Sequence, residues 1–256
     1  MRNGFNRQAP DFKGAAFTAF PTIKPMLNAI VSLFFPPSCP VCGKEGGSGI
    51  CPTCMKGIRP IQPPLCTLCG APFVSAALAE HLCGGCMKSE RSFSIARSAG
   101  LYEGTLLEAI HLLKYRGRTP LARPLASILA VTVDCAGYDI ITPVPLHRKR
   151  LQERGFNQSL LLARYLAKVA RLSLDYVNLR RIRATAPQTG LQGRERRGNV
   201  KGAFSVKNSA PFTGKRVLLV DDVYTTGATV TECSGVLKAA GAREIGVLTL
   251  ARVADM

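Results

Sequence analysis

Tryptophan is absent from this sequence of 256 residues, and aromatic residues make up only 7% of it. Proteins that hold single-stranded nucleic acids usually stack the bases on aromatic side chains, so we expect few such stacking surfaces. Hydrophobic residues nevertheless reach 46% and charged residues 20%, as in globular rather than disordered proteins. The length suits one domain of ordinary size together with a smaller module.

The sequence also lacks an apolar run long enough to cross a membrane. Its most apolar stretch, MLNAIVSLFF at residues 26–35, is about half as long as a spanning helix and ends at Pro36. The first twenty residues are mixed in polarity and contain no apolar core of a secretory signal. We therefore expect a cytoplasmic protein with no transmembrane segment. Residues 1–35 should form an N-terminal extension with a short amphipathic helix, for which a membrane-surface role is the alternative.

Acidic residues are scarce: 16 Asp and Glu oppose 34 Lys and Arg, and the net charge is +18. From His147 to Lys207 there are 15 Lys and Arg against 3 acids, a local balance of +12. Most of these cations are arginines, whose guanidinium groups bind phosphate in a bidentate manner. The stretch indicates a phosphate-bearing partner, either a small phosphate ester or nucleic acid, and the alternative is a solvated basic surface.

Eight of the ten cysteines form four C-x-x-C pairs within 48 residues. The pairs are Cys39 and Cys42, Cys51 and Cys54, Cys66 and Cys69, and Cys83 and Cys86. This spacing lets both thiolates reach one tetrahedral zinc ion, and four such ligands close a structural site. A redox dithiol would need only one pair, and a disulfide scaffold would need an oxidising compartment. The pattern predicts two structural Zn²⁺ sites.

Residues 36–90 should thus form a double zinc ribbon that depends on metal to fold. Sequential pairing assigns the first four cysteines to one site and the last four to the other, whereas a cross-braced arrangement would use them in alternation. We favour the sequential arrangement, because each half then resembles a small zinc ribbon. The two remaining cysteines, Cys135 and Cys233, are expected to be small buried side chains.

Strand-like and helix-like segments alternate through residues 91–256, which should form the main domain. Strands are expected at residues 94–102, 138–146, 212–222 and 244–253, and helices at residues 103–117, 121–135, 159–172 and 228–241. Such alternation is typical of an α/β fold in which helices flank a parallel sheet.

The segment VLLVDDVYTTGATV, residues 217–230, places two aspartates after a buried strand. Ligands of parallel sheets bind beyond the carboxyl ends of the strands, where Asp221 and Asp222 should emerge. A loop over residues 223–227 would then lead to a helix that begins near Ala228. Backbone N–H groups at such a helix start, together with threonine hydroxyls, form an anion cradle. The expected ligand carries a phosphate, vicinal hydroxyls and Mg²⁺.

This segment resembles the phosphoribosyl pyrophosphate (PRPP) signature of the type I phosphoribosyltransferases. The resemblance implies that Asp221 and Asp222 are catalytic residues that hold the ribose hydroxyls. It also implies a cradle for the 5′-phosphate, formed by Thr225, Thr226, Gly227, Ala228 and Thr229. Mg²⁺ would bind together with PRPP.

Two basic segments also resemble parts of this family. The segment PVPLHRKRLQERGFNQS follows an expected strand, where the family keeps its pyrophosphate-binding loop; its candidates are His147, Arg148, Lys149, Arg150 and Arg154. We favour Arg154 as the catalytic cation, because Gly155 follows it. Residues 183–204 resemble the mobile loop of the amidophosphoribosyltransferases, with candidates Arg183, Arg197 and Lys201. Lys114, in LKYRGR, is a further candidate for phosphate binding, although it also suits a helix C-terminus.

The segments FFPPSCPVCG, LKYRGR, PVPLHRKRLQERGFNQS and VLLVDDVYTTGAT, with the four C-x-x-C pairs, resemble the ComF family over nearly the whole chain. The resemblance implies a double zinc ribbon joined to a phosphoribosyltransferase-like domain, and a part in natural transformation. Implied partners are PRPP, single-stranded DNA and proteins of DNA uptake or recombination. Two functions stay open: a phosphoribosyltransferase with an unknown acceptor, and a DNA-handling or adaptor protein that uses the PRPP fold without turnover.

Overall fold

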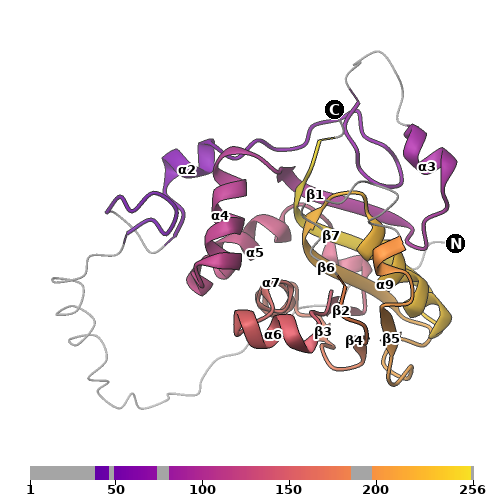
Figure 1. Cartoon of the computed structure of the whole chain (residues 1–256). Helices are drawn as coiled ribbons and strands as arrows, with labels where there is room; N and C mark the ends of the chain where they lie inside the picture. The colour runs from indigo at the N-terminus through magenta and orange to yellow at the C-terminus, as the bar shows by residue number, and fades with distance from the viewer. Residues whose placement is uncertain (1–37, 46–48, 74–80, 186–197, 255–256) are drawn as a thin grey trace, which may run out of the picture. The chain divides into compact units, whose positions relative to one another are not determined.

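The structure is a computed structural model that describes residues 38–45, 49–73, 81–185 and 198–254. The chain divides into two units, Met1–Pro37 and Ser38–Met256, and the fold below is that of the second (Figure 1). The short helix expected within residues 26–35 lies outside the described residues. In the part of the chain that is described, no helix combines the length and apolar character needed to cross a membrane.

A five-stranded parallel sheet forms the centre of the fold, with the strand order β1-β7-β6-β2-β3 (Figure 1). Its strands are β1 (Ile95–Leu101), β2 (Ile140–Pro143), β3 (Ser173–Leu174), β6 (Arg216–Tyr224) and β7 (Glu244–Arg252). The central strands are apolar on both faces because helices cover both sides. All carboxyl ends of these strands therefore lie at one edge, as parallel pairing requires.

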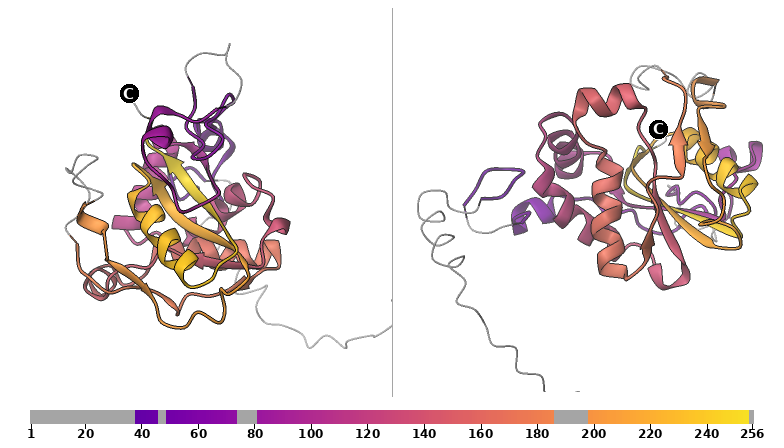
Figure 2. Two further views of the ribbon diagram at one scale, coloured as in Figure 1. Left: turned by 90° about the vertical axis from the view of Figure 1, so that its right-hand side faces the viewer. Right: turned by 90° about the horizontal axis from the view of Figure 1, so that it is seen from below.

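Helices cover the two faces of the sheet unequally. The first face carries α4 (Gly104–Tyr115), α5 (Ala122–Ala130) and α7 (Gln158–Ala170), and the second carries α9 (Ala228–Ala239). Along β6, Leu218 and Val220 pack with the first group, whereas Val217 and Leu219 pack on the side of α9. Figure 2 shows α9 on the opposite side of the sheet from the other three helices. The predicted α/β class and order of elements are thus confirmed.

Smaller elements surround this core. They are α2 (Pro52–Lys56), α3 (Gly84–Lys88), η1 (Thr119–Leu121), η2 (Cys135–Gly137), α6 (Arg148–Arg154) and an antiparallel pair, β4 (Leu179–Arg181) with β5 (Phe204–Val206). Cys135 and Cys233 are both buried, as expected.

Several boundaries differ from the sequence-based expectation, and two of the differences affect the cavity. The segment after β2 is not a loop but the helix α6, since its Arg, Lys, Gln and Glu residues favour helix. His147 caps this helix by accepting a hydrogen bond from the backbone N–H of Lys149 at 3.3 Å, and Gly155, at φ 81°, ends it. Strand β6 continues past both aspartates to Tyr224, so the ligand-facing loop begins at Thr225 rather than at residue 223.

The second half of the cysteine-rich segment packs directly on the sheet. The backbone N–H of Ala96 in β1 donates to the carbonyl of Leu68 at 2.7 Å. Gly70 adopts a φ of 69°, and a Cβ there would lie 2.6 Å from the Ala96 carbonyl oxygen. Cys66, Cys69 and Cys86 consequently belong to the same buried cluster as α9.

Close packing on β7 generates a stability prediction. A Cβ at Gly246 would lie 2.0 Å from the phenol oxygen of Tyr138, a buried ring. We expect Gly246→Ala to destabilise the fold by about 1–3 kcal/mol, since the ring must move in a filled core. The melting temperature followed by circular dichroism measures the effect.

The matched control is Gly235→Ala, in the middle of α9. Its nearest neighbour would be the Ser92 hydroxyl oxygen at 3.5 Å, an ordinary contact. Removing a helical glycine should stabilise the protein by up to about 1 kcal/mol. Equal melting temperatures for the two variants would contradict the packing argument.

Candidate functional site

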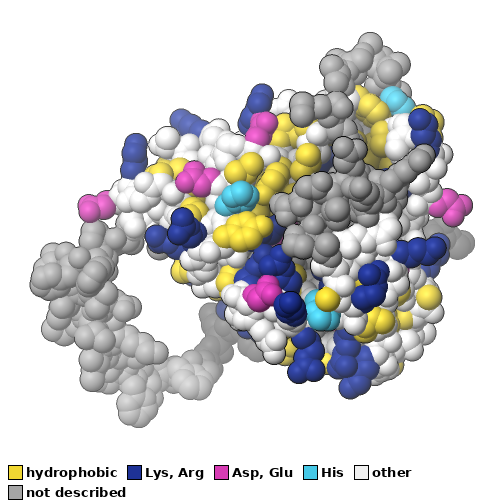
Figure 3. All heavy atoms as spheres, in the orientation of Figure 1, with side chains coloured by type: hydrophobic (Ala, Val, Ile, Leu, Met, Phe, Trp, Pro, Cys, Tyr) yellow, Lys and Arg dark blue, Asp and Glu magenta, His cyan; other side chains and the backbone are white. Residues whose placement is uncertain are grey.

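A cavity of about 680 Å³ opens at the carboxyl ends of β2 and β6, bounded by α4, α6 and the start of α9. Most of the predicted ligand-binding residues line it: Lys114, His147, Lys149, Arg150, Arg154, Asp221, Asp222, Thr225, Gly227, Ala228 and Thr229. In the view of Figure 3, Lys and Arg side chains gather around α6 on this side of the molecule. The cavity thus combines acids in its floor with cations at its rim.

Asp221 is held in the cavity floor by two hydrogen bonds. Its Oδ1 accepts from the Ser159 hydroxyl at 2.8 Å and from the backbone N–H of Asp222 at 2.9 Å. Restricted access to water raises the pKa of Asp221 to about 7, and repulsion from Asp222 adds to the rise. Ser159 and Lys114 oppose the rise without cancelling it. This carboxyl therefore changes charge near neutral pH.

Asp222 forms a buried ion pair with Lys114 at the end of α4. The Nζ of Lys114 lies 2.8 Å from Oδ1 of Asp222, and the two side chains are 15% and 6% exposed. Burial would lower the pKa of Lys114, but the attraction of Asp222 outweighs it and raises that pKa. The second oxygen, Oδ2, is buried and has no hydrogen-bond partner among the described residues. It is available to a hydroxyl group or a hard cation.

The loop after β6 leads through Gly227 directly into α9, at the position expected from the sequence. Gly227, at φ 74°, is the residue before α9, and the backbone N–H of Ala228 donates to the Thr226 hydroxyl at 3.4 Å. A Cβ at Gly227 would lie 2.2 Å from the phenol oxygen of Tyr224, so only glycine fits against this ring. Thr225 and Thr229 face the cavity, whereas Thr226 does not line it.

The helix α6 brings its cations to the cavity rim. Arg150 pairs with Glu153 at 2.9 Å on the exposed surface. Arg154 donates to Oε1 of Gln158 at 2.7 Å, and its guanidinium carbon lies 5.5 Å from the centre of the Tyr115 ring. Arg148, the first residue of α6, does not line the cavity.

Arg183 and Lys201, two candidates from the expected mobile loop, are not among the cavity residues. The guanidinium of Arg183 donates to the backbone carbonyls of Asn199 at 3.0 Å and Lys201 at 2.7 Å, which ties the two ends of this segment together. Lys201 is exposed and does not line the cavity. Arg197 lies outside the described residues.

Sequence reasoning missed several residues that the structure brings to the cavity. They are Tyr102, Tyr115, Glu153, Gln158, Ser159, Arg181 and Tyr224. Ser159 could have been noticed, because Asn157 is a typical N-cap: its side chain accepts from the N–H of Ser159 at 3.0 Å, so Ser159 lies in the first turn of α7. Tyr115 directly follows Lys114 at the end of α4. Arg181 lies on β4, in a sequence pattern that does not by itself indicate a binding site.

The eight C-x-x-C cysteines gather into two clusters of four, in sequential order. Cys39, Cys42, Cys51 and Cys54 form the first cluster, and Cys66, Cys69, Cys83 and Cys86 the second; within each, the sulfurs lie within 4.8 Å of one another. The Sγ atoms of Cys42 and Cys51 are 3.7 Å apart, as are those of Cys69 and Cys83. Zinc–sulfur bonds of about 2.3 Å in a tetrahedron place sulfurs about 3.8 Å apart. The two clusters therefore fit zinc.

Backbone N–H groups favour the thiolate form of one cysteine in each cluster, Cys39 and Cys66. The N–H of Cys51 donates to the Sγ of Cys39, and the N–H groups of Cys69 and Cys83 donate to the Sγ of Cys66. Burial would raise the pKa values of Cys39 and Cys66, but these hydrogen bonds lower both to about 6.

Two protein families match this chain, one over its cysteine-rich segment and the other over the second half of the chain. Residues 30–87 match the family of double zinc ribbon domains, and residues 157–255 match the family of phosphoribosyl transferase domains. The glutamine PRPP amidotransferase of B. subtilis is similar in structure with 25% identity and a TM-score of 0.36, over 50% of this chain and 25% of that one.

Curated relatives align along most of their own length. Competence protein F of Haemophilus influenzae is 37% identical over 219 residues, which cover 80% of this chain and 91% of that protein. The DNA utilization protein YhgH of Escherichia coli K12 is 35% identical over 215 residues, covering 81% and 92%. The competence protein ComFC of Bacillus subtilis is 27% identical over 190 residues, covering 71% and 74%.

The two family models match the paired-cysteine segment and the second half of the chain, in the order in which the structure has them. With a double zinc ribbon followed by a phosphoribosyltransferase-like domain, the chain belongs to the family of competence protein F, the ComF family.

Proposed function

We propose that the cavity binds PRPP or a closely related phosphorylated ribose. The observation that carries this proposal is the presence of two chemistries within one cavity: the carboxylates of Asp221 and Asp222, and the glycine-containing loop with the cations of α6. Carboxylates would repel a plain phosphate, but they accept hydrogen bonds from vicinal hydroxyls. A phosphorylated sugar satisfies both halves.

Each part of the cavity would have a distinct role toward PRPP. Asp222, through its unpartnered Oδ2, and Asp221 would accept hydrogen bonds from the ribose hydroxyls. The backbone of residues 225–229 would hold the 5′-phosphate at the start of α9. His147, Lys149 and Arg154 at the rim would face the diphosphate. Bound Mg²⁺ would neutralise part of the charge on the diphosphate.

In a transfer reaction, the bond between the anomeric carbon and the diphosphate breaks while a bond to an acceptor forms. Positive charge develops on the ribose ring, and the carboxylates below it would stabilise that charge. The departing diphosphate would be stabilised by the guanidinium of Arg154, which the hydrogen bond to Gln158 holds in place. Phosphoribosyl transfer to an acceptor is thus the reaction class that the residues of the cavity support.

The two cysteine clusters would hold one structural Zn²⁺ each. Four thiolates close the coordination shell, so neither metal offers an open position for catalysis. Reduced cysteines of this kind suit a reducing compartment such as the cytoplasm.

Calorimetric titration of Mg–PRPP tests the site. We expect the wild-type protein to bind it and Asp222→Asn to bind it at least about tenfold more weakly, because a charge-assisted hydrogen bond is worth about 1.5–3 kcal/mol. Asparagine keeps an oxygen that can accept a hydrogen bond from Lys114, and circular dichroism of the variant checks that it is folded. Asp139→Asn is the matched control: Asp139 lies just before β2, and its Oδ2 accepts from the backbone N–H of Arg216 at 2.8 Å. An equal loss in both variants, or no binding to the wild type, would refute the proposal.

The pH dependence of the same binding tests the role of Asp221. Its pKa is raised to about 7, so it is mostly protonated at pH 6 and mostly ionised at pH 8. Ribose hydroxyls and Mg²⁺ both favour the ionised form, so affinity should rise about tenfold between pH 6 and pH 8. The phosphates of PRPP titrate in the same range, and Asp221→Asn separates the two effects. A variant with the same pH profile as the wild type would show that Asp221 does not contribute.

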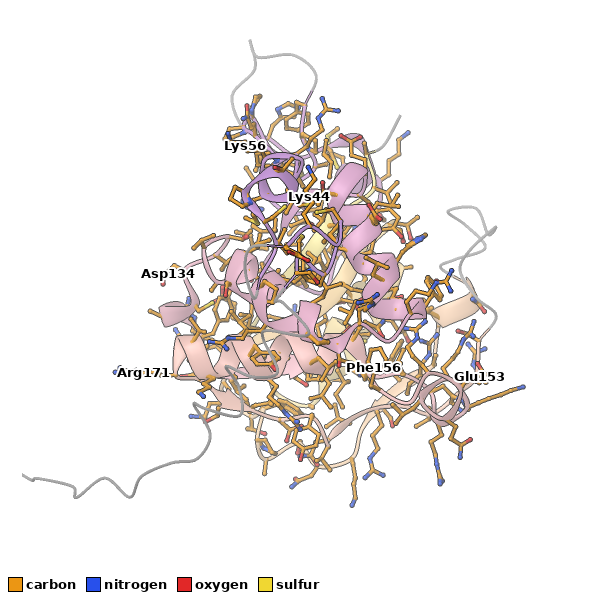
Figure 4. The ribbon with its side chains drawn as sticks, turned by 90° about the vertical axis from the view of Figure 1, so that its left-hand side faces the viewer. Lys44, Lys56, Asp134, Glu153, Phe156 and Arg171 are labelled. Carbon is orange, nitrogen blue, oxygen red and sulfur yellow. The ribbon has the colours of Figure 1, made fainter. Side chains whose placement is uncertain are left out.

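A second candidate function, the binding of single-stranded DNA, is favoured by the surroundings of Tyr115. This side chain is 63% exposed and packs edge-on against His111, with 5.4 Å between ring centres. A smaller cavity of about 210 Å³ adjoins the main one, and Tyr115, Arg150 and Arg154 line both. Figure 4 labels Glu153 on α6 and Phe156 in the following turn, which also line the smaller cavity. An exposed aromatic ring between arginines suits a base and its phosphates.

Anisotropy of a labelled oligothymidylate tests this candidate. We expect Tyr115→Ala to weaken binding by about 5- to 100-fold, because stacking of one base is worth about 1–3 kcal/mol. Tyr176→Ala removes a tyrosine that is 52% exposed and lines neither cavity, and it should bind like the wild type. Equal affinities for all three proteins would reject a stacking role for Tyr115.

A further inference from the structure

The second cysteine cluster is connected to the anion loop through a short series of buried contacts. Arg252, the last residue of β7, is 2% exposed. Its Nη1 donates to the carbonyl of Cys69 at 2.8 Å, and its Nη2 lies 3.6 Å from the Sγ of the same cysteine. The final residue of a sheet strand thus binds both the backbone and the thiol of one metal-site cysteine.

The guanidinium of Arg252 also contacts the tyrosine ring that packs against Gly227 of the loop. Its carbon lies 4.5 Å from the centre of the Tyr224 ring, and Arg252 and Tyr224 are register partners across β6 and β7. The Tyr224 ring in turn packs against Gly227 so closely that a Cβ there would lie 2.2 Å from the phenol oxygen. The order of contact is therefore Cys69, Arg252, Tyr224 and Gly227.

A second connection runs in parallel. Arg91 lies five residues after Cys86, and its Nη1 donates to the carbonyl of Thr226 at 3.2 Å and to the hydroxyl of Thr231 at 3.4 Å. These partners lie on both sides of Gly227. Burial raises the pKa of Tyr224 to about 12, and Arg91 only partly opposes this, which keeps the phenol neutral between the two arginines.

The first cysteine cluster packs against a different part of the hydrophobic core. Its surrounding side chains Val41, Ile50 and Ile58 pack on the opposite hydrophobic cluster, formed mainly by α4, α5 and α7. Cys66, Cys69 and Cys86 instead share one cluster with Tyr224, Ala228 and Val230. Of the two cysteine clusters among the described residues, it is therefore the second that lies beneath the loop that we assign to the phosphate.

We propose that Arg252 and Arg91 are positioning residues that couple metal binding at the second cluster to the conformation of residues 225–231. The coupling sets the affinity for the phosphorylated ribose, and in that respect it rests on the proposed function. When the four thiolates hold a metal, Cys69 is fixed, and Arg252 and Tyr224 are fixed with it. When the metal is lost, the floor beneath Gly227 loosens.

Hydrogen exchange of the loop amides tests the positioning role without any ligand. In Arg252→Met we expect the amides of residues 225–231 to exchange at least about tenfold faster, while the amides of α4 keep their rate. Arg97→Met is the matched control, because Arg97 also donates to this cysteine segment, at the carbonyl of Thr67, but its guanidinium donates otherwise to the carbonyl of Ala96 in β1 and not to the loop. Should Arg252→Met fail to fold, Arg91→Gln removes the half-exposed connection and should raise loop exchange in the same way. Unchanged loop exchange in the folded variant, or equal exchange in Arg97→Met, would overturn the proposal.

A double-mutant cycle tests the link to the metal. Cys83→Ser leaves three thiols in the second cluster, and we expect it to lose one zinc per chain and to exchange its loop amides faster. Adding Arg252→Met should increase the exchange little further, since both changes release the same contact. Fully additive effects would show that the cluster and Arg252 act independently. The affinity of the same proteins for Mg–PRPP should be lower in the variants whose loop amides exchange faster. If the wild type binds no PRPP, the proposed function is refuted, whereas the exchange rates of the loop still test the coupling.

Discussion

Two adjacent carboxylates at the end of a buried strand are the constraint around which the cavity is built. Asp221 and Asp222 repel each other where water is limited, and such a pair is tolerated only if opposite charge and hydrogen bonds reach it. Lys114 supplies the charge and Ser159 a hydrogen bond. These two groups come from the end of α4 and the first turn of α7. The ends of both helices are therefore tied to the last residues of β6.

This constraint also explains the uneven electrostatics of the cavity. The ion pair with Lys114 leaves the carboxylate floor with less negative charge than two free aspartates would carry, while α6 keeps its cations at the rim. A ligand that is anionic at both ends and hydroxylated in its middle fits this distribution. A ligand with a single charge would leave either the floor or the rim without partners.

The sequence predicts those features that local pattern encodes. The four apolar residues before Asp221 predict a buried strand, and Gly227 predicts a backbone that approaches a ligand closely. The C-x-x-C spacing predicts two clusters of four thiols, which the structure contains in sequential order. The cluster of cations after β2 suggests a basic loop, and this expectation misses helix α6, although Arg, Lys, Gln and Glu are good helix formers.

Contacts between residues far apart in the chain could not be predicted in this way. The pair of Lys114 with Asp222 joins a helix and a strand that no periodicity connects, and Arg252 contacts Cys69, which lies 183 positions earlier in the chain. Both contacts depend on the order in which strands enter the sheet, because β7 lies between β1 and β6. Strand order is set by the packing of whole elements rather than by any one segment.

Packing against the main domain changes the interpretation of the cysteine-rich segment. By composition it reads as an independent metal module placed before an enzyme-like domain. In the folded chain its second half accepts a backbone hydrogen bond from β1, contributes three cysteines to the main core and contacts the last residue of β7. A module attached for interaction alone would gain nothing from burying its thiols beneath a ligand loop, since metal binding already stabilises it. The burial is better explained if the order of that loop and the order of the cluster depend on each other.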